Sequence, residues 1–425
     1  MDIQEFFLDV FVPNVGLYLL SLLLLALPTY FVYKKLNSSI IDPLSFQLFM
    51  SMFANAIPIF LYLTGNCSQE LFAYFLMCEF LFWLGILIFS KTKGKFKESQ
   101  LKNGAQIEKK MFFYTFSMFF FLHMLIYIKF GIPLFMQNRT QTFAGSGGWG
   151  IISYIIPFLG IYILIYFVDK FVKKQLKGIF LICFVLYLMI LFLGGGRGAI
   201  TNLFFGYFYY TAFYLNKNPK IKWKYFLLIP MAAILTISVN LISGESPLQR
   251  FGERVVAFGD IYYFALPNNV INGIKEPNAL LHMFLPILRP LRIVQYTAEE
   301  SLPLGNKVLY QMNYEYELAG VTSAPNTRIP IATWIYFRWW GLLVSFIVGS
   351  TISFMLFRLR KYFHRTILGI SCFSYIYYLV VAGCTDLSMF LGGFFSMALN
   401  LPILVFLLML VSGGKLVYYK VKSNE

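Results

Sequence analysis

Arginine side chains are the groups in this 425-residue sequence whose spacing most clearly suggests chemistry. Arg250 and Arg254 lie four residues apart, so on a helix both guanidinium groups would project from one face. The fork of N–H donors on arginine suits phosphate or carboxylate, and two such side chains could hold a pyrophosphate. The alternative is a surface helix whose arginines form salt bridges with Glu245, Glu253 or Asp260.

Another arginine lies in a glycine-rich segment. Arg197 follows Gly194, Gly195 and Gly196 and precedes Gly198. Glycine lets the backbone approach a ligand closely, and the free N–H groups at the start of a helix attract anions. The segment therefore predicts a cradle for an oxyanion or a phosphate. The alternative is a tight hairpin between two membrane-spanning helices, in which the arginine side chain extends to the membrane interface and binds no ligand.

A histidine and two further arginines follow later in the chain. His282 and Arg289 are seven residues apart, which again places them on one helical face, and Arg292 follows shortly after. Histidine titrates near neutral pH and can act as a general acid or base. If a hydroxyl has to be deprotonated, the candidate bases are His282, Glu245 and Glu253. The alternative for His282 is a purely structural role.

Two arginines flank the start of an apolar stretch that begins near residue 330. Arg328 precedes this stretch, and Arg338 lies ten residues further on, about 15 Å along a helix. A charge at that depth in a membrane is costly and is expected to face a polar cavity, which Trp339 and Trp340 could line. Glu79, inside another apolar stretch, could partner an arginine such as Arg338 or be a packed, protonated carboxyl group.

These side chains belong to a chain that is far more apolar than a soluble domain. Hydrophobic residues make up 59% of the sequence and charged residues only 13%. The net charge of +16 does not indicate a nucleic-acid-binding protein, because the basic residues cap apolar stretches instead of forming a stripe. Their expected roles are orientation in a membrane and contact with anionic lipid.

Eleven apolar stretches have about the length that a membrane-spanning helix needs. Every second loop between them is basic, so these loops are expected inside, with the N-terminus outside and the C-terminus in the cytoplasm. The predicted fold is therefore an all-α polytopic membrane protein. The predicted spans are 13–33, 45–64, 71–90, 111–129, 149–168, 178–193, 198–215, 225–243, 330–356, 367–383 and 391–413.

The opposite, external loops are short except for residues 244–329. This loop separates helices 1–8, in residues 1–243, from helices 9–11 and the cytoplasmic tail, in residues 330–425. External loops normally lack positive charge, so arginines on this side and in the spans predict an outward-facing site for an anionic group. These arginines are Arg139, Arg197, Arg250, Arg254, Arg289, Arg292, Arg328 and Arg338.

The long external loop is expected to contain short helices. Ser246 should open one through 258, and Pro277 a second through Leu288. A loop of this length without low-complexity sequence is usually functional. Its aromatic side chains, including Tyr310 and Tyr314, could stack on sugar faces.

Motifs for several other chemistries are missing. The sequence contains no phosphate-binding loop, no H-E-x-x-H pair and no D-x-D pair. A nucleotide-driven pump and a sugar-nucleotide-dependent transferase are therefore disfavoured, and we expect neither a metal nor a cofactor. Cys67 and Cys384 both lie in predicted external loops, where they could pair or remain free.

Three features occur together in this chain. They are a Gly-Gly-Gly-Arg-Gly-Ala segment at 194–199, one long arginine-containing external loop before the third-last predicted span (330–356), and the sequence at the start of that span. The start reads Asn326-Thr327-Arg328-Ile329-Pro330, followed by Phe337-Arg338-Trp339-Trp340-Gly341. Together they resemble the O-antigen (Wzy-type) oligosaccharide repeat-unit polymerases of bacteria. The resemblance covers most of the chain by layout and is specific only in these short segments. Arg139 and Gly150 also match an Arg-x10-Gly spacing of some members, but no second copy follows Arg328.

The resemblance implies a metal-independent, inverting glycosyl transfer at the outer face of the bacterial cytoplasmic membrane, in a fold akin to the membrane-embedded lipid-sugar transferases. The donor would be a growing chain on undecaprenyl pyrophosphate, and the acceptor one repeat unit on the same lipid, for an O-antigen or a capsule. Arginine donors would stabilise the leaving pyrophosphate, and the apolar spans would hold the polyprenyl tails. A chain-length regulator protein is a further partner that the resemblance leaves open.

Two other functions remain open from the sequence. The related O-antigen ligases share this layout but transfer a finished chain to lipid A–core. A polysaccharide flippase or other secondary transporter would not be an enzyme. Transporters usually contain two matching halves, and no internal duplication is visible here.

Overall fold

The computed structural model describes residues 5–36, 39–101, 104–135, 150–194, 199–219, 252–253, 255–295, 297, 300–321, 324–412 and 418–420. Several predictions fall outside these ranges. They concern the span 225–243, most of the helix 246–258, and the side chains of Arg139, Arg197, Glu245, Arg250 and Arg254.

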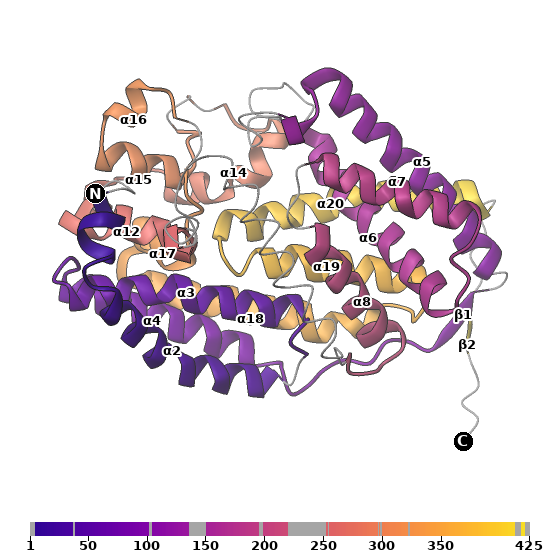
Figure 1. Ribbon diagram of the computed structural model, residues 1–425, viewed down its shortest axis with the longest axis horizontal. Coiled ribbons are helices and arrows are strands. Elements are labelled where there is room, and N and C mark those ends of the chain that lie inside the picture. Colours follow the sequence, from indigo (N-terminus) through magenta and orange to yellow (C-terminus); the bar gives the residue numbers. More distant parts are fainter. Residues whose placement is uncertain are drawn as a thin grey trace. The chain divides into compact units, whose positions relative to one another are not determined.

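The described residues fold almost entirely into helices, as Figure 1 shows. Seven helical stretches among them are long and apolar enough to cross a membrane. The prediction of a helical, multi-pass membrane protein is thereby confirmed. The helices at the predicted spans are α2 (Val15–Leu36), α3 (Pro43–Leu63), α4 (Gln69–Leu87), α5 (Gly104–Phe130), α6 (Gly150–Val172), α7 (Ile179–Leu193), α8 (Ala199–Tyr209), α18 (Gly341–Ser353), α19 (Ile367–Ala382) and α20 (Leu387–Ser412).

The described part of the predicted external loop contains short helices, as expected. One of them, α14, corresponds to the helix predicted over 277–288, but it continues through Pro286 and Pro290 to Leu291. The helices of this region are α12 (Asp260–Ala265), α13 (Val270–Gly273), α14 (Ala279–Leu291), α15 (Leu304–Met312) and α16 (Glu315–Leu318). The next helix, α17 (Ile329–Phe337), opens the predicted span 330–356. Two short strands elsewhere, β1 (Ser99–Leu101) and β2 (Tyr418–Lys420), pair in antiparallel register.

The chain forms two compact units. Unit 1 consists of Met1–Lys91, Lys220–Phe354 and Val381–Leu391. Unit 2 consists of Thr92–Pro219, Met355–Val380 and Gly392–Glu425. All the described site candidates from the sequence belong to unit 1.

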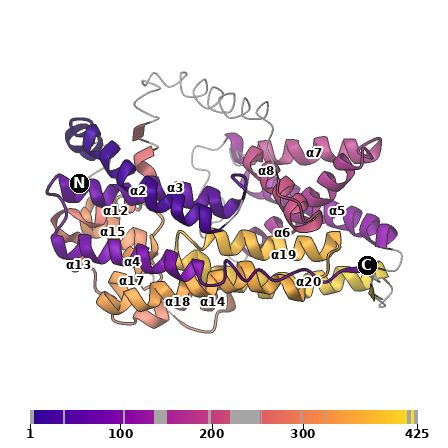
Figure 2. The same ribbon diagram turned by 90° about the horizontal axis from the view of Figure 1, so that it is seen from below.

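Unit 1 is built around the close pairing of α4 with α18, which lie side by side in Figure 1 and Figure 2. Glycines make this approach possible. A Cβ atom at Gly85 would lie 2.6 Å from the carbonyl oxygen of Phe346, and one at Gly349 would lie 2.2 Å from that of Phe82. Small residues at such crossings let two membrane helices bring their backbones into contact.

The predicted span 330–356 is not one straight helix, which corrects the sequence analysis. Helix α17 ends at Phe337, a 3-10 turn follows (Arg338–Trp340), and α18 begins at Gly341. Arg338 has a φ of 49°, unusual for a residue with a side chain. The chain bends so sharply that a Cβ atom at Gly341 would lie 2.1 Å from the Tyr74 hydroxyl oxygen. Only glycine fits this contact, so the break is built into the packing.

Unit 2 combines aromatic packing with a few buried polar links. Asn400 on α20 donates from Nδ2 to the Tyr375 hydroxyl oxygen at 2.7 Å and to the carbonyl oxygen of Tyr154 at 2.9 Å. These bonds tie together α6, α19 and α20. Near the other end of α6, buried Asp169 accepts a hydrogen bond from the Tyr210 hydroxyl at 2.9 Å. Polar side chains inside apolar helix bundles find partners in this way.

Candidate functional site

Helix α17 connects three of the residues singled out in the sequence. Arg328 occupies the N-cap position, and Pro330 stands in the first turn, where its missing N–H costs nothing. Tyr336, in the last turn, contacts His282, and Arg338 is the C-cap residue. A nine-residue helix thus positions Arg328, Arg338 and, through Tyr336, His282.

Arg328 is buried, with 7% of its surface exposed. Its Nη2 donates to the carbonyl oxygen of Phe258 at 2.8 Å, and its Nη1 donates to the Ser51 hydroxyl oxygen at 3.4 Å. Its backbone forms an antiparallel bridge with Asp386, which lies just before α20. The guanidinium group therefore faces protein acceptors on several sides.

Two carboxyl groups interact with the charge of Arg328. Glu79 on α4 is one, and it also accepts a hydrogen bond from the Trp83 indole at 3.2 Å. The second is Asp260 at the start of α12. Burial raises the pKa of Asp260 to about 6, although the N–H of Ile261 and the charge of Arg328 act in the opposite direction. Glu79 and Asp260 are both partly buried, so Arg328 is a buried positive charge that interacts with two acids of unit 1.

His282 is buried on α14, and both of its ring nitrogens have partners. Nε2 lies 2.8 Å from the carbonyl oxygen of Leu302, which can only accept, so Nε2 carries the hydrogen. Burial lowers the pKa of His282, and the nearby charge of Lys307 lowers it further, which favours the neutral ring. Nδ1 then accepts a hydrogen bond from the Tyr336 hydroxyl at 2.6 Å.

An ion pair lies beside this histidine. Lys307 on α15 pairs with Glu276, and their side chains are only 15% and 4% exposed. A cavity of about 10 Å³ is lined by His282, Glu276 and Glu300, among others. That volume is about what a single water needs, so a substrate group has no room against His282 in this arrangement.

Arg338 lies at the surface, which corrects the prediction that it faces a cavity deep inside a span. Its Nη1 donates to Oδ1 of Asn272 at 2.7 Å, and the guanidinium carbon lies 5.3 Å from the centre of the Trp334 ring. The Trp334 indole donates to the same Asn272 oxygen at 2.9 Å. Trp340, beside the arginine, is 76% exposed. Arg338 is therefore anchored on one side and open on the other.

The remaining described candidates lie on the surface of the loop region. Arg289 and Arg292 are exposed at the C-terminal end of α14, where positive charge also suits the helix dipole. Glu253 is partly buried. The Tyr310 hydroxyl donates to the carbonyl oxygen of Val321 at 2.8 Å, whereas Tyr314 is 62% exposed. Of the two tyrosines predicted to contact sugar, Tyr314 presents more of its ring.

Sequence reasoning missed several residues that hold this region together. Tyr336 and Asn272 are the main ones, because each joins two of the candidate residues or their neighbours. Neither carries a sequence signal, since a tyrosine or asparagine near an apolar stretch is common at membrane interfaces. Cys67 and Cys384, whose pairing the sequence left open, are both buried free thiols.

No family model matches the chain, and comparisons with curated proteins and with solved structures found no match. The function therefore has to be inferred from the residues and their geometry.

Proposed function

We propose that this protein is a membrane glycosyltransferase that polymerises undecaprenyl-pyrophosphate-linked oligosaccharide repeat units for a bacterial surface polysaccharide. The observation that carries the proposal is the arrangement around α17. One helix at the start of a membrane segment holds a buried arginine, an exposed anchored arginine and, through Tyr336, a neutral histidine. Arg338 would supply a phosphate donor and His282 a base, close to the boundary between the predicted external loop and the span that follows it.

The reaction needs positive charge where the leaving group departs. The acceptor hydroxyl oxygen forms a bond to the anomeric carbon of the donor chain, the bond from that carbon to the pyrophosphate oxygen breaks, and the hydroxyl proton passes to a base. Arg338 suits the leaving pyrophosphate, because Asn272 fixes its guanidinium group while one side remains open. Arg289 and Arg292 add exposed positive charge. Arg328 acts indirectly, by neutralising the acids inside unit 1.

If His282 is the base, the side chains around it have to rearrange before it can bind the acceptor hydroxyl. Its Nδ1 is occupied by the Tyr336 hydroxyl, so the acceptor hydroxyl has to replace that partner. Glu253, which is partly buried, remains the second described candidate. Glu245 was also predicted as a base, and it lies outside the described residues.

The proposal includes a membrane topology and a set of partners. It places eleven spans in the bacterial cytoplasmic membrane, the N-terminus and residues 244–329 outside, and the C-terminus inside. Donor and acceptor are both carried on undecaprenyl pyrophosphate, and the surrounding partner is membrane lipid. A chain-length regulator protein is a further partner that the proposal leaves open. Arginine charge takes the place that a divalent ion has in other reactions with phosphate leaving groups.

The test is reconstitution of the purified protein in liposomes with lipid-pyrophosphate-linked repeat units, EDTA and no ATP. We expect a ladder of polymer lengths. Arg338→Ala should lose most of this activity, and Arg338→Lys should restore little of it, because lysine lacks the planar fork that binds phosphate through two bonds. Leu343→Ala, at an exposed apolar position on α18, is the matched control and should remain active.

Three outcomes would contradict the proposal. Product that forms only when lipid A–core is added would identify a ligase. Movement of the lipid-linked unit across the bilayer without a new glycosidic bond would identify a transporter. Activity that disappears in EDTA and returns with Mg²⁺ would mean that arginine does not provide the charge for the leaving group.

A further inference from the structure

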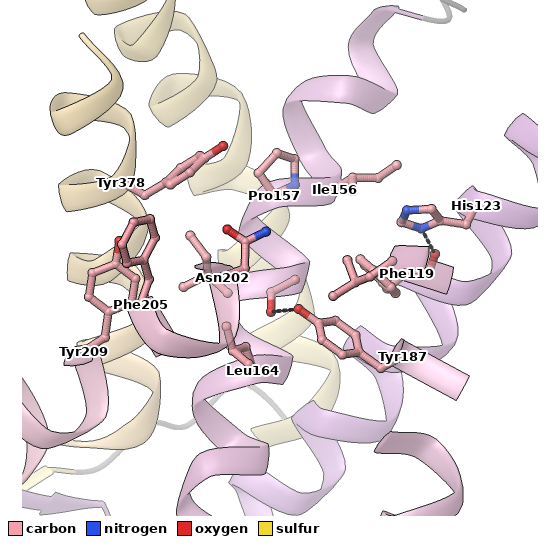
Figure 3. A pocket seen from close by; sticks show the side chains of 13 residues that line it. Phe119, His123, Ile156, Pro157, Leu164, Tyr187, Asn202, Phe205, Tyr209 and Tyr378 are labelled. Atoms are coloured by element: carbon pink, nitrogen blue, oxygen red, sulfur yellow. Dashed lines mark hydrogen bonds between the residues drawn. The ribbon is translucent and has the colours of Figure 1, made fainter. Parts of the chain in front are cut away.

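Unit 2 contains a cavity of about 180 Å³ between α5, α6, α7, α8 and α19, shown in Figure 3. None of the described arginine and histidine candidates discussed above lines it, and Arg139 and Arg197 lie outside the described residues. Its walls consist mainly of aliphatic and aromatic side chains, among them Phe119, Ile156 and Leu164. Among the described residues of its wall there is no aspartate, glutamate, lysine or arginine, so these residues offer no counterion to an ionic group.

Two polar side chains of the cavity, Asn202 and Tyr378, lie near helix ends on one side, whereas Tyr209 lies at the other end of α8. Asn202 is three residues from the start of α8, about 5 Å along the axis, and Tyr378 is four residues from the end of α19, about 6 Å. Leu164 and Phe119 lie deeper, about 21 Å and 16 Å from the corresponding ends of α6 and α5. Alternation of the spans places all four of these helix ends on the predicted external side.

His123 also lines the cavity, and its ring is bonded to the backbone of its own helix. Its Nδ1 lies 2.9 Å from the carbonyl oxygen of Phe119, as the dashed line in Figure 3 marks. A carbonyl only accepts, so Nδ1 carries a hydrogen. Asn202 and Tyr378 thus supply hydrogen-bonding groups near the predicted external side, and most of the remaining wall is aliphatic or aromatic.

We propose that this cavity binds a segment of the hydrocarbon chain of a membrane lipid, which enters from the outer leaflet with its uncharged upper part beside Asn202 and Tyr378. The size fits a chain segment and excludes a whole lipid, because a dry protein cavity of roughly 150 Å³ holds one benzene molecule. Straight acyl chains and isoprenoid chains share this chemistry. The inference does not depend on the proposed glycosyl transfer, although a preference for isoprenoid would connect the two.

Gly160 provides a sharp test, because it lies in the cavity wall on α6. A Cβ atom there would be 3.5 Å from Phe119 Cε2 and 3.9 Å from the Tyr187 hydroxyl oxygen, which are ordinary contacts. Gly160→Ala should therefore be tolerated and is the matched control. Gly160→Leu should extend into the cavity and exclude several methylene groups of a bound chain, at a loss in affinity of about fourfold for each.

The experiment uses the purified full chain in liposomes with two photoreactive probes, a phosphatidylglycerol with a diazirine in its acyl chain and an isoprenyl phosphate with a diazirine in its chain. Mass spectrometry then locates the labelled peptides. We expect label on the helices that line the cavity, retained in Gly160→Ala and reduced at least about tenfold in Gly160→Leu. Ile156→Trp is a second filling variant, in case Gly160→Leu does not give a monodisperse protein.

The two probes also distinguish the source of the chain. Stronger labelling by the isoprenyl phosphate would point to a carrier lipid, and equal or stronger labelling by the phosphatidylglycerol to bulk lipid; both support a chain-binding cavity. Asn202→Leu should leave the labelling unchanged or raise it, because hydrocarbon makes the main contact. Loss of labelling in Asn202→Leu, or labelling that Gly160→Leu and Ile156→Trp do not reduce, would overturn the proposal.

Discussion

Replacing either of the two arginines at the ends of α17 by methionine should have a different main effect. Arg328→Met should lower the stability of the fold, whereas Arg338→Met should remove activity with little loss of stability. Arg328→Met removes a buried guanidinium group, its bonds to Phe258 and Ser51, and the countercharge of two carboxyl groups. Removing a buried charge that compensates others costs about 3–5 kcal/mol, which is a change of roughly 150- to 5,000-fold in the unfolding equilibrium. Arg338→Met removes exposed contacts to Asn272 and Trp334, worth about 1 kcal/mol.

The assay measures stability and function separately. Thermal unfolding of the detergent-purified variants, followed by loss of the monodisperse peak in gel filtration, should show a large shift for Arg328→Met and a small one for Arg338→Met. Arg338→Met should nevertheless lose polymerisation, since it leaves the fold intact and removes the open phosphate donor. A stable but inactive Arg328→Met would refute the assignment of Arg328 as an internal countercharge. A fully active Arg338→Met would refute the role given to Arg338.

Three further predictions concern unit 1 and the topology. Lys307→Met should destabilise the protein by about 3–5 kcal/mol, because it leaves the buried Glu276 carboxylate without its ion-pair partner. The double variant Lys307→Met with Glu276→Gln should recover most of this lost stability in thermal unfolding. The pKa of His282 is lowered in the folded protein, so the unfolded chain binds a proton at this residue more readily. The stability that the neutral His282 contributes is therefore fully present above about pH 6.5 and is lost as pH falls toward the folded-state pKa. In His282→Phe, the free energy of unfolding should depend less steeply on pH on the acid side. Alkaline phosphatase fused near residue 300 should be active and near residue 100 inactive, and the reverse result would contradict the external position of residues 244–329.

The helices of the membrane region could be predicted because a bilayer imposes a strict rule on the backbone. Without water, every N–H and C=O group in a span must bond within the helix, so apolar length alone identifies the segment. The predicted span 45–64, for example, appears as α3 over Pro43–Leu63. Span 178–193 appears as α7 over Ile179–Leu193. Neither prediction required knowledge of a neighbouring helix.

The break between α17 and α18 could not be predicted in this way. The residues from Phe337 to Trp340 contain no proline or glycine, and they continue the apolar pattern. At this break Gly341 packs so closely against Tyr74, far away in sequence, that a side chain would not fit. The break also leaves Arg338 at the surface and not at an expected buried position, which changes the role that the residue can have.

Residue type and spacing alone identified Arg328, Arg338 and His282 as chemically important, since an arginine or histidine near a membrane span is costly unless it has a partner. Which partner each one has was decided only by the tertiary structure. Arg328 faces the carbonyl oxygen of Phe258, and His282 binds Tyr336 across 54 positions of sequence. A charged side chain carries the same donors wherever it lies, but burial and the acceptors around it determine whether those donors stabilise the fold or remain open to a ligand.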